Sequence, residues 1–220
     1  MERVFAMKNV RIYYKKLDRM KFVSHLDMTR FMSRVITRSK IPVWYTEGFN
    51  QHIYMNFALP LSLGFESECE IVDIRLTDDS FELGEVLKAL SSVSIDGVEF
   101  TDVKEPVLPT KEIGFSVFEL KVDGMNEEVK AALCDFLSWD AILCEKVGKK
   151  GKVKQIDLIP KIRNWSLSED SLTLTLVAGS EDNLNPSLVL STFFEQTNTN
   201  PLDYSVTRTA ILDKNGNDFK

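Results

Sequence analysis

The side chains best suited to proton transfer near neutral pH are the two histidines of the chain, His25 and His52. An imidazole titrates near pH 7 and can act as a general acid or a general base. Two imidazoles could share the cleavage of RNA at a 2′-hydroxyl without a metal ion. Neither residue lies in a nucleophile motif or in a His-Glu-x-x-His metal motif. They are therefore candidates either for a metal-independent ribonuclease or for structural roles at a helix start and in a loop.

Arginines recur at helical spacing after His25. We predict a helix over residues 24–39. On this helix, Asp27 is followed at spacings of three, four and four residues by Arg30, Arg34 and Arg38. Asp27 can pair with Arg30, which leaves Arg34 and Arg38 without a local carboxylate. The planar guanidinium group suits phosphate because it donates two parallel hydrogen bonds. The stripe is either a phosphate-binding face or an ordinary solvated helix face.

Aromatic and amide side chains gather in the loop that follows the predicted helix; they include Trp44, Phe49, Asn50, His52 and Tyr54. Proteins bind single-stranded nucleic acid by stacking bases on such rings while cations pair with phosphates. The alternative is a packed loop whose rings belong to the core. A second basic stretch, predicted as a hairpin, supplies further candidate phosphate contacts: Lys146, Lys149, Lys150, Lys152 and Lys154.

Charge is unevenly distributed along the chain. The net charge is −6, but residues 1–50 carry 11 Lys and Arg against 4 Asp and Glu. A basic segment in an acidic chain suggests a polyanionic partner. The three cysteines, Cys69, Cys134 and Cys144, lack metal-ligand spacing, so we expect no metal and no other cofactor. Without a signal peptide or a membrane-spanning run, we expect a cytoplasmic protein.

Apolar periodicity predicts an α+β fold with the order β-α-β-β-α-β, which then repeats. The segment 105–113 contains Pro106 and Pro109 and lacks periodicity, which is typical of a linker. We therefore predict two tandem ferredoxin-like (βαββαβ) domains, at residues 1–104 and 114–220. The second half has one extra strand candidate.

The run FVSHLDMTRFMSRVITRSKIPVWYTEGFNQHIYMNFALPLSLGFESECE resembles the signature of the radical-SAM-linked family, a bacterial domain encoded beside or fused to a cobalamin-type radical SAM protein. The matching positions are Ser24, His25, Leu26, Asp27, Arg30, Arg34, Gly48, Phe49, Asn50, His52, Pro60, Leu61, Leu63, Gly64, Glu66 and Ser67. The stretch 153–160 also resembles this family. Gln51, Ile53 and Ser62 stand where the family favours prolines, and Glu47 stands where it favours glutamine, which loosens the loop around His52.

The resemblance implies a radical SAM protein as partner. Together with the basic stripe, it leads us to expect an RNA-binding or substrate-delivery module for the modification or processing of transfer or ribosomal RNA. We expect a pocket formed by the following residues: His25, Asp27, Phe49, Asn50, His52, Tyr54 and Glu66. The alternatives are a ribonuclease that uses His25 and His52, and a protein-interaction subunit that binds no nucleic acid.

Overall fold

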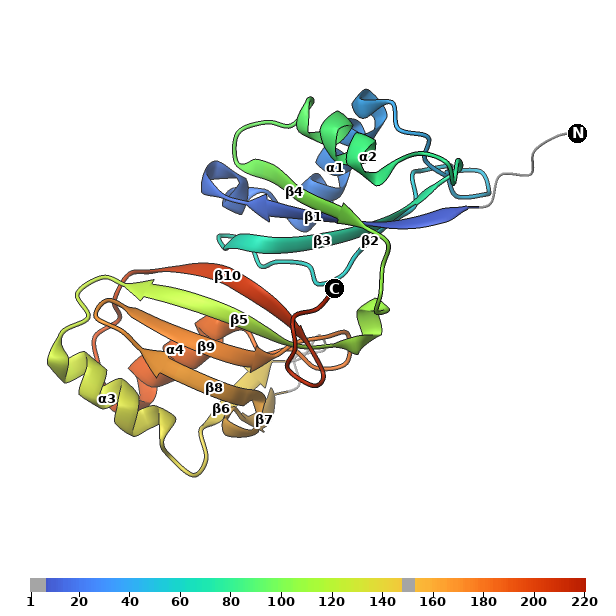
Figure 1. Ribbon diagram of the computed structural model, residues 1–220. Helices are drawn as coiled ribbons and strands as arrows, with labels where there is room; N and C mark the ends of the chain where they lie inside the picture. Colours follow the sequence, from blue (N-terminus) through green and yellow to red (C-terminus); the bar gives the residue numbers. More distant parts are fainter. Residues whose placement is uncertain (1–6, 148–152) are drawn as a thin grey trace, which may run out of the picture. The chain divides into compact units, whose positions relative to one another are not determined.

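The computed structural model describes residues 7–147 and 153–220, and the α+β class predicted from the sequence is confirmed (Figure 1). The candidate lysines Lys149, Lys150 and Lys152 lie outside the described residues. The chain divides into two compact units. The N-terminal unit contains the residues up to Glu112 together with Phe219–Lys220, and the C-terminal unit contains Ile113–Asp218.

The N-terminal unit follows the order β-α-β-β-α-β, with a short 3-10 helix after its first strand. Its elements are β1 (Lys8–Lys16), η1 (Asp18–Phe22), α1 (His25–Ser39), β2 (Met55–Phe57), β3 (Glu66–Leu76), α2 (Leu83–Ser91) and β4 (Val98–Lys104). The strands lie in the order β4-β1-β3-β2, and each neighbouring pair is antiparallel. The central strands β1 and β3 are therefore paired along both edges.

Both helices of this unit cover the same face of its sheet (Figure 1). Side chains alternate across a strand, so Val10 and Ile12 of β1 point toward the helices and are fully buried. Met32 of α1 and Leu90 of α2 belong to the same apolar core. The opposite face of β1 and β3 carries polar residues, and it contains the site described below.

The C-terminal unit has the same order with an inserted hairpin. Its elements are β5 (Ile113–Val122), α3 (Glu127–Leu137), β6 (Leu143–Val147), β7 (Val153–Asp157), η3 (Ile159–Lys161), β8 (Ile162–Leu167), β9 (Ser171–Val177), α4 (Pro186–Thr197) and β10 (Tyr204–Asp213). The main strands lie in the order β10-β5-β9-β8, and β6 and β7 form a separate two-stranded sheet. Helices α3 and α4 meet through Phe136 and Phe193, whose ring centroids are 5.5 Å apart.

The second arm of the basic hairpin, predicted from the sequence over residues 153–163, is a strand only as far as Asp157. The chain leaves the hairpin at Asp157 and turns through η3, and a new strand begins at Ile162. Proline has no N–H group for a sheet hydrogen bond, so Pro160 cannot continue a paired strand. The Asp157 carboxylate instead accepts the backbone N–H groups of Ile142 and Ile159 at 3.0 and 3.1 Å. The extra strand that the sequence suggested is accounted for by the inserted β6–β7 hairpin.

The end of the chain stabilises the N-terminal unit through Phe219, which is 4% exposed. Its ring centroid lies 4.7 Å from Cζ of Arg11. Replacing Phe219 with Ala should lower the free energy of unfolding by about 3 kcal/mol, because a buried aromatic side chain is lost and a cavity remains. Urea denaturation followed by tryptophan fluorescence measures this change. Phe49→Ala is the matched control, since Phe49 is fully exposed and its loss should leave stability unchanged. Equal effects of the two variants would contradict the packing of Phe219.

Candidate binding site of the N-terminal unit

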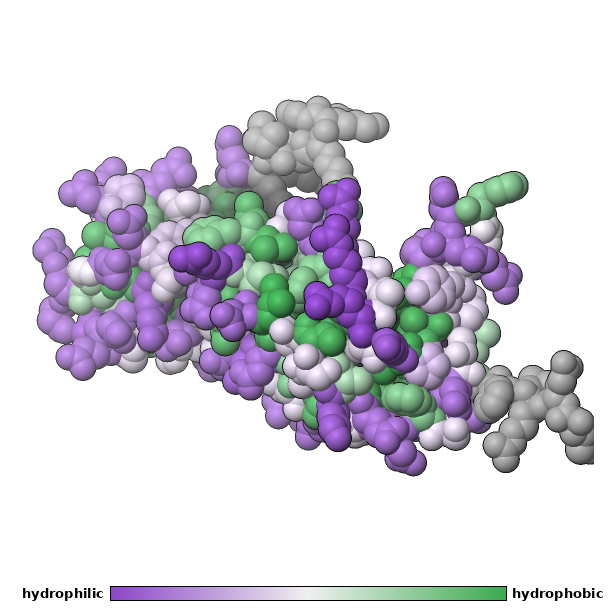
Figure 2. All heavy atoms as spheres, turned by 90° about the horizontal axis from the view of Figure 1, so that it is seen from above, coloured by the Kyte–Doolittle hydropathy of each residue, from purple (hydrophilic) through white to green (hydrophobic). Residues whose placement is uncertain are grey.

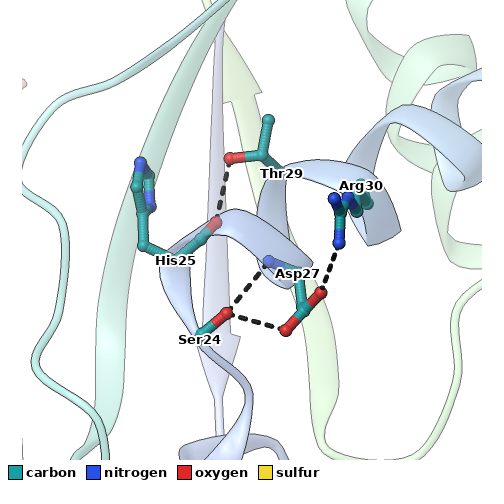
Figure 3. A network of polar contacts seen from close by, with 5 residues as sticks. All are labelled: Ser24, His25, Asp27, Thr29 and Arg30. Atoms are coloured by element: carbon teal, nitrogen blue, oxygen red, sulfur yellow. Dashed lines mark hydrogen bonds and ion pairs between the residues drawn. The ribbon is translucent and has the colours of Figure 1, made fainter.

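Ser24 is the N-cap of helix α1 (Figure 3). The Ser24 hydroxyl accepts the backbone N–H of Asp27 at 3.2 Å and donates to the Asp27 carboxylate at 2.7 Å. Arg30 donates to the other oxygen of Asp27 at 3.1 Å. The hydrogen bond from Ser24, followed by that from Arg30, holds the pKa of the Asp27 carboxyl below its ordinary value. Asp27 is thus a charged part of the helix start, exposed to solvent.

The two histidines have separate surroundings. His25 is the first residue of α1, and its ring meets that of Phe57 edge-on at 5.1 Å. Nδ1 of His52 lies 3.1 Å from the Thr46 hydroxyl and 3.0 Å from the backbone oxygen of Asn50. In the described part of the chain, no carboxylate makes a hydrogen bond to either imidazole. The geometry therefore gives neither ring the orienting partner that a general base commonly has.

His52 fastens a loop that presents an exposed aromatic ring. Thr46 donates its backbone N–H to the oxygen of His52 at 2.8 Å, and His52 donates its own N–H to the Thr46 hydroxyl at 3.3 Å. Between these residues Gly48 has φ +114°, in the region that favours glycine. Phe49 follows it, with its side chain fully exposed. We call residues 46–52 the Phe49 loop.

The arginine stripe lies on the exposed surface of α1. Arg30 pairs with Asp27, as the sequence spacing suggested. Arg34 and Arg38 are exposed and make no hydrogen bond or ion pair with other described residues. Of the basic hairpin, the structure describes the backbone of Lys146 and Lys154, which occupy paired positions on β6 and β7.

A polar cluster on the sheet face away from the helices was not predicted from the sequence. Arg11 of β1 donates two hydrogen bonds to Asp73 of β3, from Nε at 2.7 Å and from Nη2 at 2.9 Å. The Arg11 residue is 0% exposed. Burial alone would lower the pKa of this guanidinium, but hydrogen bonding to Asp73 and attraction by its charge raise the pKa above its ordinary value. The pair is a buried, charge-assisted contact between the two central strands.

Arg75, two residues beyond Asp73 on the same face, contacts two aromatic rings. Its Cζ lies 4.3 Å from the ring centroid of Tyr54 and 5.3 Å from that of Trp44. Nε of Arg75 donates to the side-chain oxygen of Asn9 at 3.2 Å. Trp44 and Tyr54, expected from the sequence to stack bases, thus already contact a cation of the protein.

A pocket of about 360 Å³ in the N-terminal unit is lined by both arginines, Arg11 and Arg75. The polar lining consists of Asn9, Arg11, Tyr54, Asn56, Asp73 and Arg75, and residues 106–110 form a second side. Of the residues expected to form a pocket, Tyr54 alone belongs to this lining. Glu66 instead accepts a hydrogen bond from Lys21 at 3.2 Å. His25, Asp27, Phe49, Asn50 and His52 lie on the start of α1 and on the Phe49 loop.

The signal for this cluster was present but ambiguous. Arg11 and Asp73 alternate with apolar neighbours along their strands, and the same alternation is typical of a solvated sheet face. A solvated sheet face and a buried polar cluster differ in whether other residues cover the polar face. Here the covering residues are distant in sequence from the strands. Asn9, Asn56 and Arg75 were missed for the same reason.

A family model described as "Uncharacterized protein conserved in bacteria (DUF2344)" matches residues 9–186. The chain therefore belongs to this conserved bacterial family. None of the curated proteins matches it.

Two solved structures are distantly similar to the chain. An unknown protein from Galdieria sulphuraria is 12% identical, with 92% of this chain and 99% of that chain covered, at a TM-score of 0.30. A putative glycine cleavage system transcriptional repressor is 10% identical, with 91% and 96% covered, at a TM-score of 0.26.

Within residues 7–147 and 153–220, no three or more His, Cys, Asp or Glu residues are grouped as metal ligands. No helix in the same residues has the length and apolar character required to span a bilayer.

Removal of the Asp73 carboxylate tests the buried pair. Asp73→Ala should lower the free energy of unfolding by about 3 kcal/mol, because the Arg11 charge remains buried without its counter-ion. Chemical denaturation of the purified variant gives this value. In the matched control, Asp27→Ala, the remaining Arg30 is exposed to water, so the loss should be much smaller. Similar losses in both variants would show that the Arg11–Asp73 pair is solvated.

Proposed function

We propose that the chain is a binding module that recognises single-stranded RNA through its N-terminal unit. The observation that carries the proposal is the pair of exposed arginines on α1, Arg34 and Arg38, which have no partner among the described residues. Such groups can pair with phosphate without breaking an existing ion pair. Their guanidinium forks match phosphate oxygens.

The Phe49 loop supplies the second element of this mode of binding. It follows α1 in the chain, it is fastened by His52 and Thr46, and it presents an aromatic ring with both faces free. A ring of this kind stacks on unpaired bases and tolerates any sequence. Asn50 is exposed next to Phe49 and offers an amide to a base edge. Lys146 and Lys154 would add phosphate contacts from the C-terminal unit.

We also propose that both units are ferredoxin-like domains. In each unit, two β-α-β segments are interleaved so that the first and third main strands are central. All neighbouring strands within each unit's main sheet are antiparallel. These features agree with the split βαβ arrangement, to which the β6–β7 hairpin is an addition.

The partner that we propose is a radical SAM protein, to which this module would deliver RNA for modification. The support is the resemblance of residues 22–70 to the radical-SAM-linked family. In this proposal the chain holds the substrate, and the partner supplies the chemistry.

A protein-interaction subunit without nucleic acid is the second candidate. Apolar side chains are exposed around the start of α1, at Phe22 and Leu26, and also at Leu63. The backbone N–H of Gly64 donates to the oxygen of Lys21 at 2.8 Å, so Leu63 and Phe22 belong to adjoining segments. Figure 2 shows hydrophobic atoms reaching the surface between hydrophilic side chains. Exposed apolar groups of this kind are typical of protein contacts when they are contiguous.

RNA binding that weakens with added salt is the test that separates the two candidates. Substitution of Arg30, Arg34 and Arg38 by Ala should weaken binding to every single-stranded RNA. It should also reduce the salt slope, by about 0.7 for each lost phosphate contact. Fluorescence anisotropy with a labelled oligonucleotide at several salt concentrations measures both quantities.

The matched control removes the same charge from other exposed positions: Lys88, Lys111 and Lys121. This triple variant should keep both the affinity and the salt slope. If the two triple variants behave alike, the effect of the arginines reflects net charge and the proposed face is wrong. If the unaltered chain does not bind RNA, the protein-interaction candidate takes first place.

The histidines should contribute no catalysis. We expect the purified chain to leave RNA intact in excess chelator, because neither imidazole is oriented by a carboxylate in the described residues. His52→Ala should weaken RNA binding, since the Phe49 loop loses the contacts of Nδ1 with Thr46 and Asn50 and keeps only its backbone hydrogen bonds. Gel analysis of incubated RNA checks the first expectation, and anisotropy checks the second. RNA cleavage that falls by about 10²–10⁴-fold in His25→Ala would instead establish general acid–base catalysis and a ribonuclease.

A further inference from the structure

The pocket on the polar sheet face contains a buried donor that the protein leaves unsatisfied. Arg11 uses Nε and Nη2 to bind Asp73, while Nη1 is buried and has no hydrogen-bond partner among the described residues. Tyr13 is close enough to this guanidinium to add both a hydrogen-bond and an electrostatic contribution to its pKa, and burial raises the pKa of the Tyr13 phenol. An unpaired buried donor is costly, and the cost is removed when an acceptor such as a water or an ion binds to it.

The second guanidinium of the pocket is held in a fixed position. Arg75 is stacked on Tyr54 and bonded to Asn9, so little side-chain freedom remains to be lost when a ligand binds. Arg75 is only partly buried and is the more accessible of the two arginines. Asn9 and Asn56 add side-chain amides to the lining.

The charge of the lining favours an anion. It contains two arginines and a single carboxylate, Asp73, which already accepts both of its hydrogen bonds from Arg11. The remaining lining is uncharged and includes Val107 and Leu108, which offer apolar contact beside the polar groups. The volume of about 360 Å³ falls within the range of small-molecule sites.

We propose that this pocket binds a small organic molecule through an anionic oxygen group, a carboxylate or a phosphate, held by Arg75 and Arg11. Two guanidinium groups at one site match the several oxygens of such a group. Val107 and Leu108 would contact the less polar part of the ligand. The site is separate from the arginine stripe of α1 and does not depend on RNA binding.

Titration of the full chain with inorganic phosphate, and separately with acetate, tests the proposal and distinguishes the two chemistries. NMR spectra of the arginine Nε–H groups report the contact. We expect the Arg75 and Arg11 signals to shift with one or both anions and to stay in place with sodium chloride at the same ionic strength. A response to phosphate alone assigns a phosphate ligand, and a response to acetate alone assigns a carboxylate.

Arg75→Gln should weaken the anion affinity about tenfold, as expected when one charge-assisted contact is lost. Arg19→Gln is the matched control, because it removes the same charge from an exposed residue outside the pocket and should leave the affinity unchanged. The Arg30, Arg34 and Arg38 triple variant should also retain anion binding. Unshifted Arg75 and Arg11 signals with both anions would overturn the proposal, as would equal affinities of Arg75→Gln and Arg19→Gln. The wild-type spectra decide the question even if Arg75→Gln does not fold.

Discussion

The constraint on which the N-terminal unit most depends is the burial of the Arg11–Asp73 pair between its two central strands. A charge removed from water must be paired, and here the register that sets Arg11 opposite Asp73 provides the partner. Shifting this register by one residue would place Val10 or Val72 on the polar face and the charges in the apolar core. The ion pair and the apolar core therefore specify the same alignment of β1 and β3.

The same alignment creates the pocket. Residues two apart on a strand share a face, so Asn9 must lie beside Arg11, and Arg75 beside Asp73. The pairing of Asn9 with Arg75 and of Asn56 with Asp73 then brings four polar side chains to one region. The backbone hydrogen bonds that hold the sheet together thus also position these polar side chains of the pocket.

Local signals in the sequence were sufficient for some elements and insufficient for others. Helix α1 could be predicted because Ser24 caps it and because Met28 and Met32 recur on its buried face. The prediction of one strand across Pro160 was wrong because it followed the apolar alternation and disregarded the missing N–H group of proline. The polar pocket could not be predicted, since Arg11 and Asp73 are 62 residues apart and only the strand pairing joins them.

The two sets of arginines differ in a way that separates their proposed roles. Arg34 and Arg38 lie in water, where their attraction for phosphate is long-ranged and is weakened by salt. Arg11 is removed from solvent and already has a counter-ion, so it adds little to the field that guides a polyanion toward the surface. Its remaining N–H donors instead act at short range. A ligand must place a hydrogen-bond acceptor against them, because otherwise the donors and the polar groups of the ligand both lack hydrogen bonds. The exposed arginines on α1 are therefore suited to binding RNA regardless of its sequence. The buried arginine and its stacked neighbour Arg75 are suited to selecting one small anion by its shape.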